Sequence, residues 1–176
     1  PRYRLPSAVP FLPGNGLGYY PLMKTLDLFC TVIDNFGDIG VCRRLALQLH
    51  REYGYTVRLW VDDLAAFARL EPGLDTQAPV QTLRGLEIRH WTPDAATGIT
   101  PGDLVMEGFG CRLPEIFLRA MAARRPAPVW INLEYLSAED WTLGCHGLPS
   151  PHPQLPLKQH FFFPGFTPRT GGLLRE

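Results

Sequence analysis

The sequence has no surplus of charge of either sign, because 17 Lys and Arg residues balance 17 Asp and Glu residues in a chain of 176. A protein that binds nucleic acid needs a cationic surface to displace counterions from phosphates, so this balance argues against that class of partner. Long apolar runs are also missing, and none approaches the roughly 18 residues that cross a bilayer. We therefore expect a globular protein that binds neither nucleic acid nor a membrane.

The sequence also lacks a C-x-x-C pair among its four cysteines, Cys30, Cys42, Cys111 and Cys145. This spacing excludes a zinc ribbon and a secreted disulfide framework, and we expect small buried thiols in a reducing cytoplasm. A zinc site formed by Cys145 and the histidines at 146, 152 and 160 is the less favoured interpretation, because their spacing departs from finger patterns.

Residues 1–22 show no helical or strand periodicity and contain five prolines and three glycines. The prolines at 6, 10 and 13 interrupt the only stretch that could have been a signal-peptide core. We interpret residues 1–22 as a disordered extension, a tag or a mis-set start, and expect the folded domain to span residues 23–176.

From Met23 onward, strand and helix patterns alternate. Strands are predicted at 26–33, 56–61, 86–91, 103–109 and 129–133, and helices at 41–53, from Asp62 or Asp63 to 70, at 114–123, and after a capping box at 137–140. This alternation predicts an α/β fold, a Rossmann-like open parallel sheet with helices on both faces. The proline-rich segment 144–172 is expected to be a structured loop or a connection between domains, with Phe161–Phe163 in a buried strand.

The loop after the first predicted strand, Asp34-Asn35-Phe36-Gly37-Asp38-Ile39-Gly40, holds two carboxylates four positions apart. Ligands of open parallel sheets bind beyond the carboxyl ends of strands, so both acids are expected to face a solvent-filled crevice. Three uses compete: Asp38 as a helix cap with Asp34 as a turn former, ligation of a divalent metal, or recognition of a cation and abstraction of its proton. A phosphate site is disfavoured, because the loop lacks a Gly-rich phosphate motif and its acids would repel an anion.

Several longer blocks carry a family resemblance, among them FCTVIDNFGDIGVCRRLALQL, VRLWVDDLAAFARL, PVWINLEYLSAEDW, GCHGLPSPHP and KQHFFFPGFTPRTGGLLRE. Together they resemble the N-terminal half of the EarP family, the protein-arginine rhamnosyltransferases that modify bacterial translation elongation factor P. The resemblance implies an inverting GT-B glycosyltransferase that transfers rhamnose from dTDP-β-L-rhamnose to an arginine without a catalytic metal or other cofactor. It also implies that residues 23–176 form the N-terminal, acceptor-side domain, truncated before the C-terminal domain that binds the donor.

In that family the two acids of the D-N-[FY]-G-D-I-G loop are essential, and they match Asp34 and Asp38. A carboxylate can orient a guanidinium through charge-assisted hydrogen bonds, and a second can accept its proton. We therefore assign orientation chiefly to Asp34 and proton acceptance to Asp38.

Other candidate residues follow the predicted strands at the same edge of the sheet. Glu134 and Tyr135 are candidate acceptor-binding residues. Alternatively, Glu134 pairs with a surface arginine, and Tyr135 stabilises its own loop. Asn132 is expected to stabilise that loop too. Glu107 and Phe109 belong to the same region. The rim of the cleft is expected to hold Phe36, Gly37, Ile39 and Gly40.

Two interpretations of function remain. This chain is either the acceptor-binding part of the rhamnosyltransferase, carrying the general base but inactive alone, or a non-catalytic module that binds elongation factor P.

Overall fold

The computed structural model describes residues 25–33 and 36–174, and the expectation for residues 1–22 lies outside this range. The strands are β1 (Thr25–Cys30), β2 (Thr56–Val61), β3 (Val80–Leu83), β4 (Leu86–His90), β5 (Leu104–Gly108), β6 (Val129–Leu133), β7 (Pro149–Pro151) and β8 (Lys158–Phe162). The helices are α1 (Gly37–Tyr53), α2 (Leu64–Ala68), α3 (Glu115–Ala123) and α4 (Thr142–Cys145). Among these described helices, none is long and apolar enough to cross a membrane.

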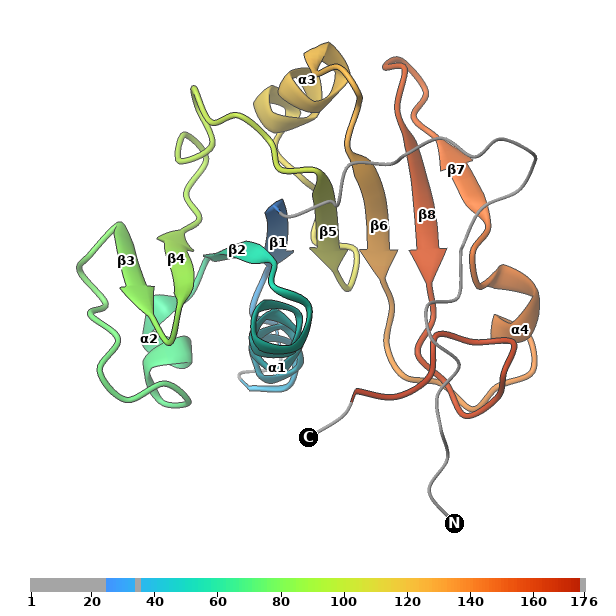
Figure 1. Cartoon of the computed structure of the whole chain (residues 1–176), viewed down its shortest axis with the longest axis horizontal. Helices are drawn as coiled ribbons and strands as arrows, with labels where there is room; N and C mark the ends of the chain where they lie inside the picture. The colour runs from blue at the N-terminus through green and yellow to red at the C-terminus, as the bar shows by residue number, and fades with distance from the viewer. Residues whose placement is uncertain (1–24, 34–35, 175–176) are drawn as a thin grey trace.

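All eight strands form one sheet in the order β3-β4-β2-β1-β5-β6-β8-β7 (Figure 1). The six inner strands are parallel to one another, with Leu28 of β1 in register with Leu59 of β2 on one side and Met106 of β5 on the other. The predicted α/β class and open sheet are therefore confirmed, but the sheet is mixed. Its two edge strands, β3 and β7, are antiparallel to their neighbours.

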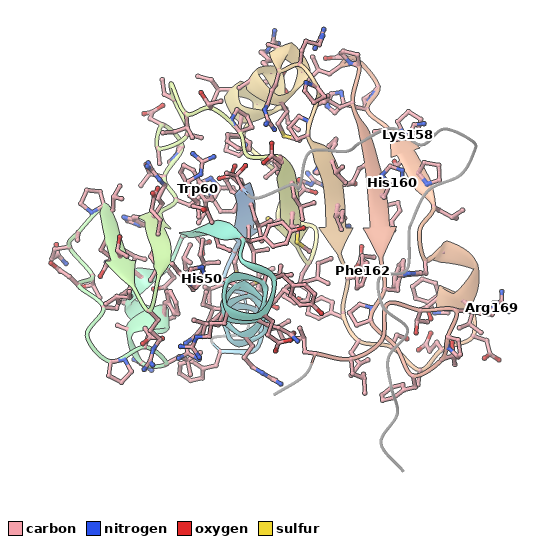
Figure 2. All side chains as sticks on the ribbon, in the orientation of Figure 1. His50, Trp60, Lys158, His160, Phe162 and Arg169 are labelled. Atoms are coloured by element: carbon pink, nitrogen blue, oxygen red, sulfur yellow. The ribbon has the colours of Figure 1, made fainter. Side chains whose placement is uncertain are left out.

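Neighbouring residues of each parallel strand point to opposite faces of the sheet, and each face is covered by helices. Leu28 packs with Ile39 of α1 and Phe67 of α2 in one core cluster. Phe29 packs with Phe117 of α3 in the other cluster and stacks on Trp60, which is labelled in Figure 2, with ring centroids 5.1 Å apart. The near-continuous apolar runs of the strands at 26–30 and 56–61 are explained by this two-sided burial.

Several predicted boundaries are confirmed. Helix α1 ends where Gly54 adopts a left-handed conformation with φ 72°, and the Asp63 side chain caps α2 by accepting from the Ala66 N–H at 2.9 Å. Helix α3 begins directly after Pro114, and β6 covers the predicted residues 129–133.

Three expectations about elements were wrong. Strand β3 was missed, because Val80–Leu83 is a short edge strand that pairs, within the described part of the chain, with β4 alone. The capping box at 137–140 does not start a helix: the Ser137 hydroxyl accepts from the Glu139 N–H at 3.1 Å, and α4 begins only at Thr142. The segment 144–172 is a loop only in part, since it contributes β7 and β8 to the sheet. The strand expected at Phe161–Phe163 is present as the end of β8, which stops at Phe162.

Candidate functional site

The described part of the loop after β1 leads into α1, whose second residue is Asp38. Phe36, not Asp38, occupies the N-cap position, so the interpretation of Asp38 as the helix cap is wrong. Asp38 is fully buried, which also corrects the expectation that its carboxylate faces solvent. Its partner in the predicted pair, Asp34, lies outside the described residues.

The Asp38 carboxylate accepts hydrogen bonds on both oxygens. The Ile33 backbone N–H donates to Oδ2 at 3.1 Å, and the Tyr135 hydroxyl donates to Oδ1 at 2.9 Å. The loop after β6 therefore reaches across the carboxyl edge of the sheet to the start of α1.

The close approach of α1 to the sheet depends on Gly108 at the end of β5. A Cβ atom at this position would lie 2.8 Å from Cys42 Sγ and 3.0 Å from the Phe29 carbonyl oxygen. Cys42 follows Asp38 by one turn of the helix, so both side chains project from the same face of α1. The missing side chain at Gly108 thus allows α1 to bring Asp38 within reach of Tyr135.

Tyr135 is held from the other side by Phe109, which follows β5. The two rings are stacked with centroids 4.3 Å apart and an interplanar angle of 14°. The Tyr135 side chain is otherwise at the surface, with 52% of the residue exposed. The structure thus joins Tyr135, a predicted site residue, to Asp38 through its hydroxyl and to Phe109 through its ring.

Glu134 is not part of this contact network. Its carboxylate accepts from Asn132 Nδ2 at 2.7 Å, two residues back along the chain, whereas Tyr135 turns to Asp38. Partial burial raises the pKa of Glu134, and the Asn132 hydrogen bond opposes that effect. The two adjacent candidates therefore point to different partners, as the alternation of an extended chain requires.

The predicted rim is correct only in part. Phe36 and Gly37 are exposed, and the Arg69 guanidinium lies 6.0 Å from the centroid of the Phe36 ring. Gly40 is half-buried. Ile39 is not on the rim, because it belongs to the buried face of α1 and packs in the core.

A polar network below the loop 109–113 was only partly expected. Asn132 Oδ1 accepts from the Gly110 N–H at 3.0 Å, so Asn132 stabilises the loop after β5 as well as contacting Glu134 in its own loop. Glu107 is also buried, accepts from the Leu113 N–H at 2.9 Å, and is contacted by Gln159 Nε2 of β8. Burial raises the pKa of Glu107, while these two hydrogen bonds act in the opposite direction. No sequence signal marked Gln159, because its contact requires β8 to lie beside β6.

The cysteines in the described structure are free thiols, with Cys30 and Cys42 buried and the other two half-buried. The pKa of the Cys30 thiol is raised chiefly by a hydrogen bond with Cys42 and, next in importance, by burial. The histidines of the disfavoured zinc interpretation have other roles: His146 Nδ1 accepts from the Phe163 N–H, and His152 Nδ1 accepts from the Leu155 N–H. Within residues 25–33 and 36–174, no group of three or more His, Cys, Asp or Glu side chains could hold a metal ion.

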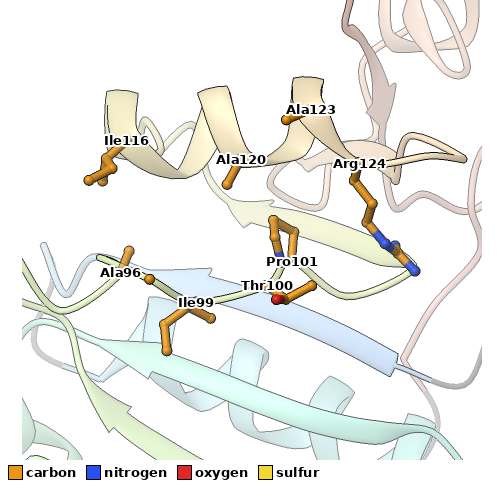
Figure 3. Close-up of a pocket in the computed structure, with 9 residues that line it drawn as sticks. Ala96, Ile99, Thr100, Pro101, Ile116, Ala120, Ala123 and Arg124 are labelled. Atoms are coloured by element: carbon orange, nitrogen blue, oxygen red, sulfur yellow. The ribbon is translucent and has the colours of Figure 1, made fainter.

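A separate hollow of about 400 Å³ lies between α3 and the segment that leads into β5 (Figure 3). It is lined mainly by small and aliphatic residues, among them Ile99, Pro101 and Ala120, with Arg124 at one end. This segment precedes β5, so the hollow is at the amino end of that strand, opposite the edge that carries Asp38. It does not contribute to the site.

Comparisons with known proteins give a consistent result. The family model described as "Elongation-Factor P (EF-P) rhamnosyltransferase EarP" matches residues 26–176. A protein-arginine rhamnosyltransferase of Pseudomonas putida is 57% identical over 155 residues, covering 88% of this chain and 41% of the relative. Proteins of the same name from Shewanella oneidensis and Pseudomonas aeruginosa are 50% and 51% identical, covering 85% and 88% of this chain and 39% and 40% of the relatives. This chain therefore spans about two fifths of the length of these relatives.

Proposed function

This chain belongs to the EarP family of elongation factor P rhamnosyltransferases, and from that premise we propose that it forms the acceptor side of a protein-arginine rhamnosyltransferase. The donor in this proposal is dTDP-β-L-rhamnose and the acceptor is an arginine of translation elongation factor P. The open, mostly parallel sheet supports the assignment of this chain as a Rossmann-like domain, which we take to be the N-terminal domain of a GT-B enzyme. The proposal further takes the enzyme to be inverting, cytoplasmic and independent of a catalytic metal, as in the family that the sequence resembles. The donor is then bound mainly by a part of the enzyme outside this chain.

The observation that carries the proposal is the position of Asp38 within the matched residues. It lies at the carboxyl edge of a parallel sheet, where open α/β folds bind their ligands, and it is buried with hydrogen bonds from two neutral groups. An arginine side chain has a pKa above 12 and is a poor nucleophile while it keeps its proton. A carboxylate held away from water can accept that proton as the new bond forms.

The reaction then follows from these groups. Asp34 orients the planar guanidinium by charge-assisted hydrogen bonds. One guanidinium nitrogen attacks the anomeric carbon while the carbon–oxygen bond to dTDP breaks on the opposite face, and dTDP leaves with the electron pair. Asp38 takes the nitrogen proton. Tyr135, whose hydroxyl contacts Asp38, borders the path by which the arginine enters, and Glu134 adds negative charge next to it.

The test is an Asp38→Asn substitution in the complete enzyme that contains this chain. A general base contributes roughly 10²- to 10⁴-fold, so turnover should fall by that factor, equivalent to about 3 to 5 kcal/mol of transition-state stabilisation. Mass spectrometry of elongation factor P incubated with dTDP-rhamnose measures the added sugar. The matched control is Asp94→Asn, at an exposed position between β4 and β5, which should keep full activity.

Undiminished turnover by Asp38→Asn would contradict the assignment. It would instead favour the non-catalytic binding module, so this substitution separates the two interpretations of the chain's function. Both interpretations predict that this chain alone transfers no sugar. Binding of elongation factor P without sugar transfer is expected, because the donor site is assigned elsewhere in the enzyme.

A further inference from the structure

Phe109 has a backbone conformation that is costly for an aromatic residue. Its φ is 57°, in the left-handed region, where a side chain with a Cβ atom loses about 1–2 kcal/mol. It lies between Gly108 and Gly110, either of which would adopt such a conformation at no steric cost. A strained bulky residue persists only where its surroundings determine its conformation, and such residues concentrate at functional sites.

The surroundings of Phe109 do determine its conformation. Its N–H donates to the Leu133 carbonyl at 2.7 Å, which extends the β5–β6 ladder by one hydrogen bond. Gly110, the next residue, is fixed by Asn132, and the end of the loop is fixed by Glu107 through the Leu113 N–H. Both anchoring side chains are buried, so the loop is held at its beginning and at its end.

The consequence of this conformation is the ring contact with Tyr135. The stacked Phe109 ring covers one face of a tyrosine that is half exposed, and thereby limits the rotation of its side chain. Stacked aromatic pairs contribute about 0.5–1.5 kcal/mol beyond their buried area. The Tyr135 hydroxyl in turn donates to Asp38 Oδ1 at 2.9 Å. A continuous chain of contacts therefore runs from the strained residue to the carboxylate.

We propose that Phe109 is a positioning residue for the general base: its ring fixes Tyr135, whose hydroxyl orients the Asp38 carboxylate toward the acceptor arginine. This inference rests on the proposed function. Phe109 itself does not touch Asp38 in this arrangement and acts through Tyr135. The strain is maintained because a relaxed glycine at position 109 would leave the tyrosine without its support.

The test uses Phe109→Gly and Phe109→Tyr in the complete enzyme. Phe109→Gly relieves about 1–2 kcal/mol of backbone strain but loses the stacking and core packing of the ring, so these effects offset and Tm should change little. In contrast, kcat should fall about tenfold, the factor expected for one lost hydrogen bond. KM for the acceptor should change less than twofold. Phe109→Tyr keeps a stacking ring and should retain the wild-type kcat. A merely structural role would instead make kcat follow Tm.

A double-mutant cycle with Tyr135→Phe tests whether Phe109 acts on Asp38 through the Tyr135 hydroxyl. If Phe109 acts through the Tyr135 hydroxyl, Phe109→Gly should have no further effect on kcat in the Tyr135→Phe background. Additive losses, or a Phe109→Gly enzyme with wild-type kcat, would overturn the inference.

A crystal structure of the Phe109→Gly variant gives a readout that does not depend on activity. The Tyr135 hydroxyl should no longer lie within hydrogen-bond distance of Asp38, and an unchanged contact would overturn the inference. Wild-type sugar transfer separately reports on the proposed function. A wild type without transferase activity therefore refutes that function, while the contact in the variant still decides the role of Phe109.

Discussion

At the scale of single residues, buried polar groups hold the loops that form the site in place. Glu107 of β5 is buried, is contacted by Gln159 of β8, and holds the loop that contains Phe109. Its pKa is raised, so the folded protein retains a proton at a pH where the unfolded chain has lost it. The contribution of this group to stability is present below the unfolded pKa near 4.5 and is lost as pH rises through the folded value.

The resulting prediction concerns Glu107→Gln. The variant cannot ionise, so its Tm relative to the wild type should rise as pH is increased from about 4.5 to 7.5. Thermal unfolding at a series of pH values measures this difference. Glu115→Gln, at an exposed position of α3 that pairs with Arg119, is the matched control and should change Tm little throughout. A difference in Tm between Glu107→Gln and the wild type that is the same at every pH would contradict the raised pKa of Glu107.

At the scale of elements, the site depends on how closely α1 packs on the carboxyl end of β5. Gly108 permits this contact, since any side chain there would meet both a helix side chain and a strand carbonyl. The same contact fixes the position of Asp38, which is one helical turn before Cys42. Packing between these two elements and the geometry of the site are therefore coupled.

We expect Gly108→Ala to destabilise the protein by about 1–3 kcal/mol, because the added methyl group overpacks a filled space. It should also lower the transferase activity of the complete enzyme, since the shift of α1 separates Asp38 from Tyr135. Denaturant unfolding and the sugar-transfer assay measure the two effects. The matched control is Gly144→Ala in α4, where a Cβ atom would have no neighbour within 4 Å. Equal stability of the two variants would show that Gly108 does not limit the approach of α1.

At the scale of the whole molecule, one buried carboxylate joins segments that are far apart in the sequence. Asp27 of β1 is fully buried and accepts from Arg58 at 2.7 Å, from the Trp60 indole at 2.8 Å and from the Gly102 N–H at 2.7 Å. It thus ties β1, β2 and the segment before β5 together at the amino edge. The centre of the sheet is held there, opposite the edge that carries the site.

Asp27→Ala should therefore lower the free energy of unfolding by about 3–5 kcal/mol, because it leaves the buried Trp60 indole and the buried Gly102 amide without their acceptor and removes the carboxylate partner of the half-buried Arg58. Urea unfolding followed by tryptophan fluorescence measures the loss. Glu115→Ala breaks an exposed ion pair and should cost less than about 0.5 kcal/mol. A loss as small as that of the control would mean that the carboxylate contributes little to the sheet.

The central part of this fold can be predicted from local patterns in the chain. The strands at 56–61 and 129–133, the end of α1 at Gly54 and the cap at Asp63 follow from apolar spacing, glycine conformation and side-chain capping, which act between residues close in the chain. Reasoning from parallel strands also pointed to the carboxyl edge and its paired acids, but it left three uses of these acids open, and the role of Asp38 as general base came from the family resemblance. Local patterns were sufficient wherever the deciding interaction was local.

The contacts of the site depend instead on long-range packing. Whether Asp38 faces solvent or lies buried against Tyr135 depends on how far α1 approaches β5, and whether Glu134 or Tyr135 turns to the acid depends on the face of the sheet that each meets. The edge strands β3 and β7, the place of β8 beside β6 and the burial of Ile39 likewise depend on partners distant in sequence. Such long-range packing leaves no periodic signal in the chain, so it could be read only from the folded molecule.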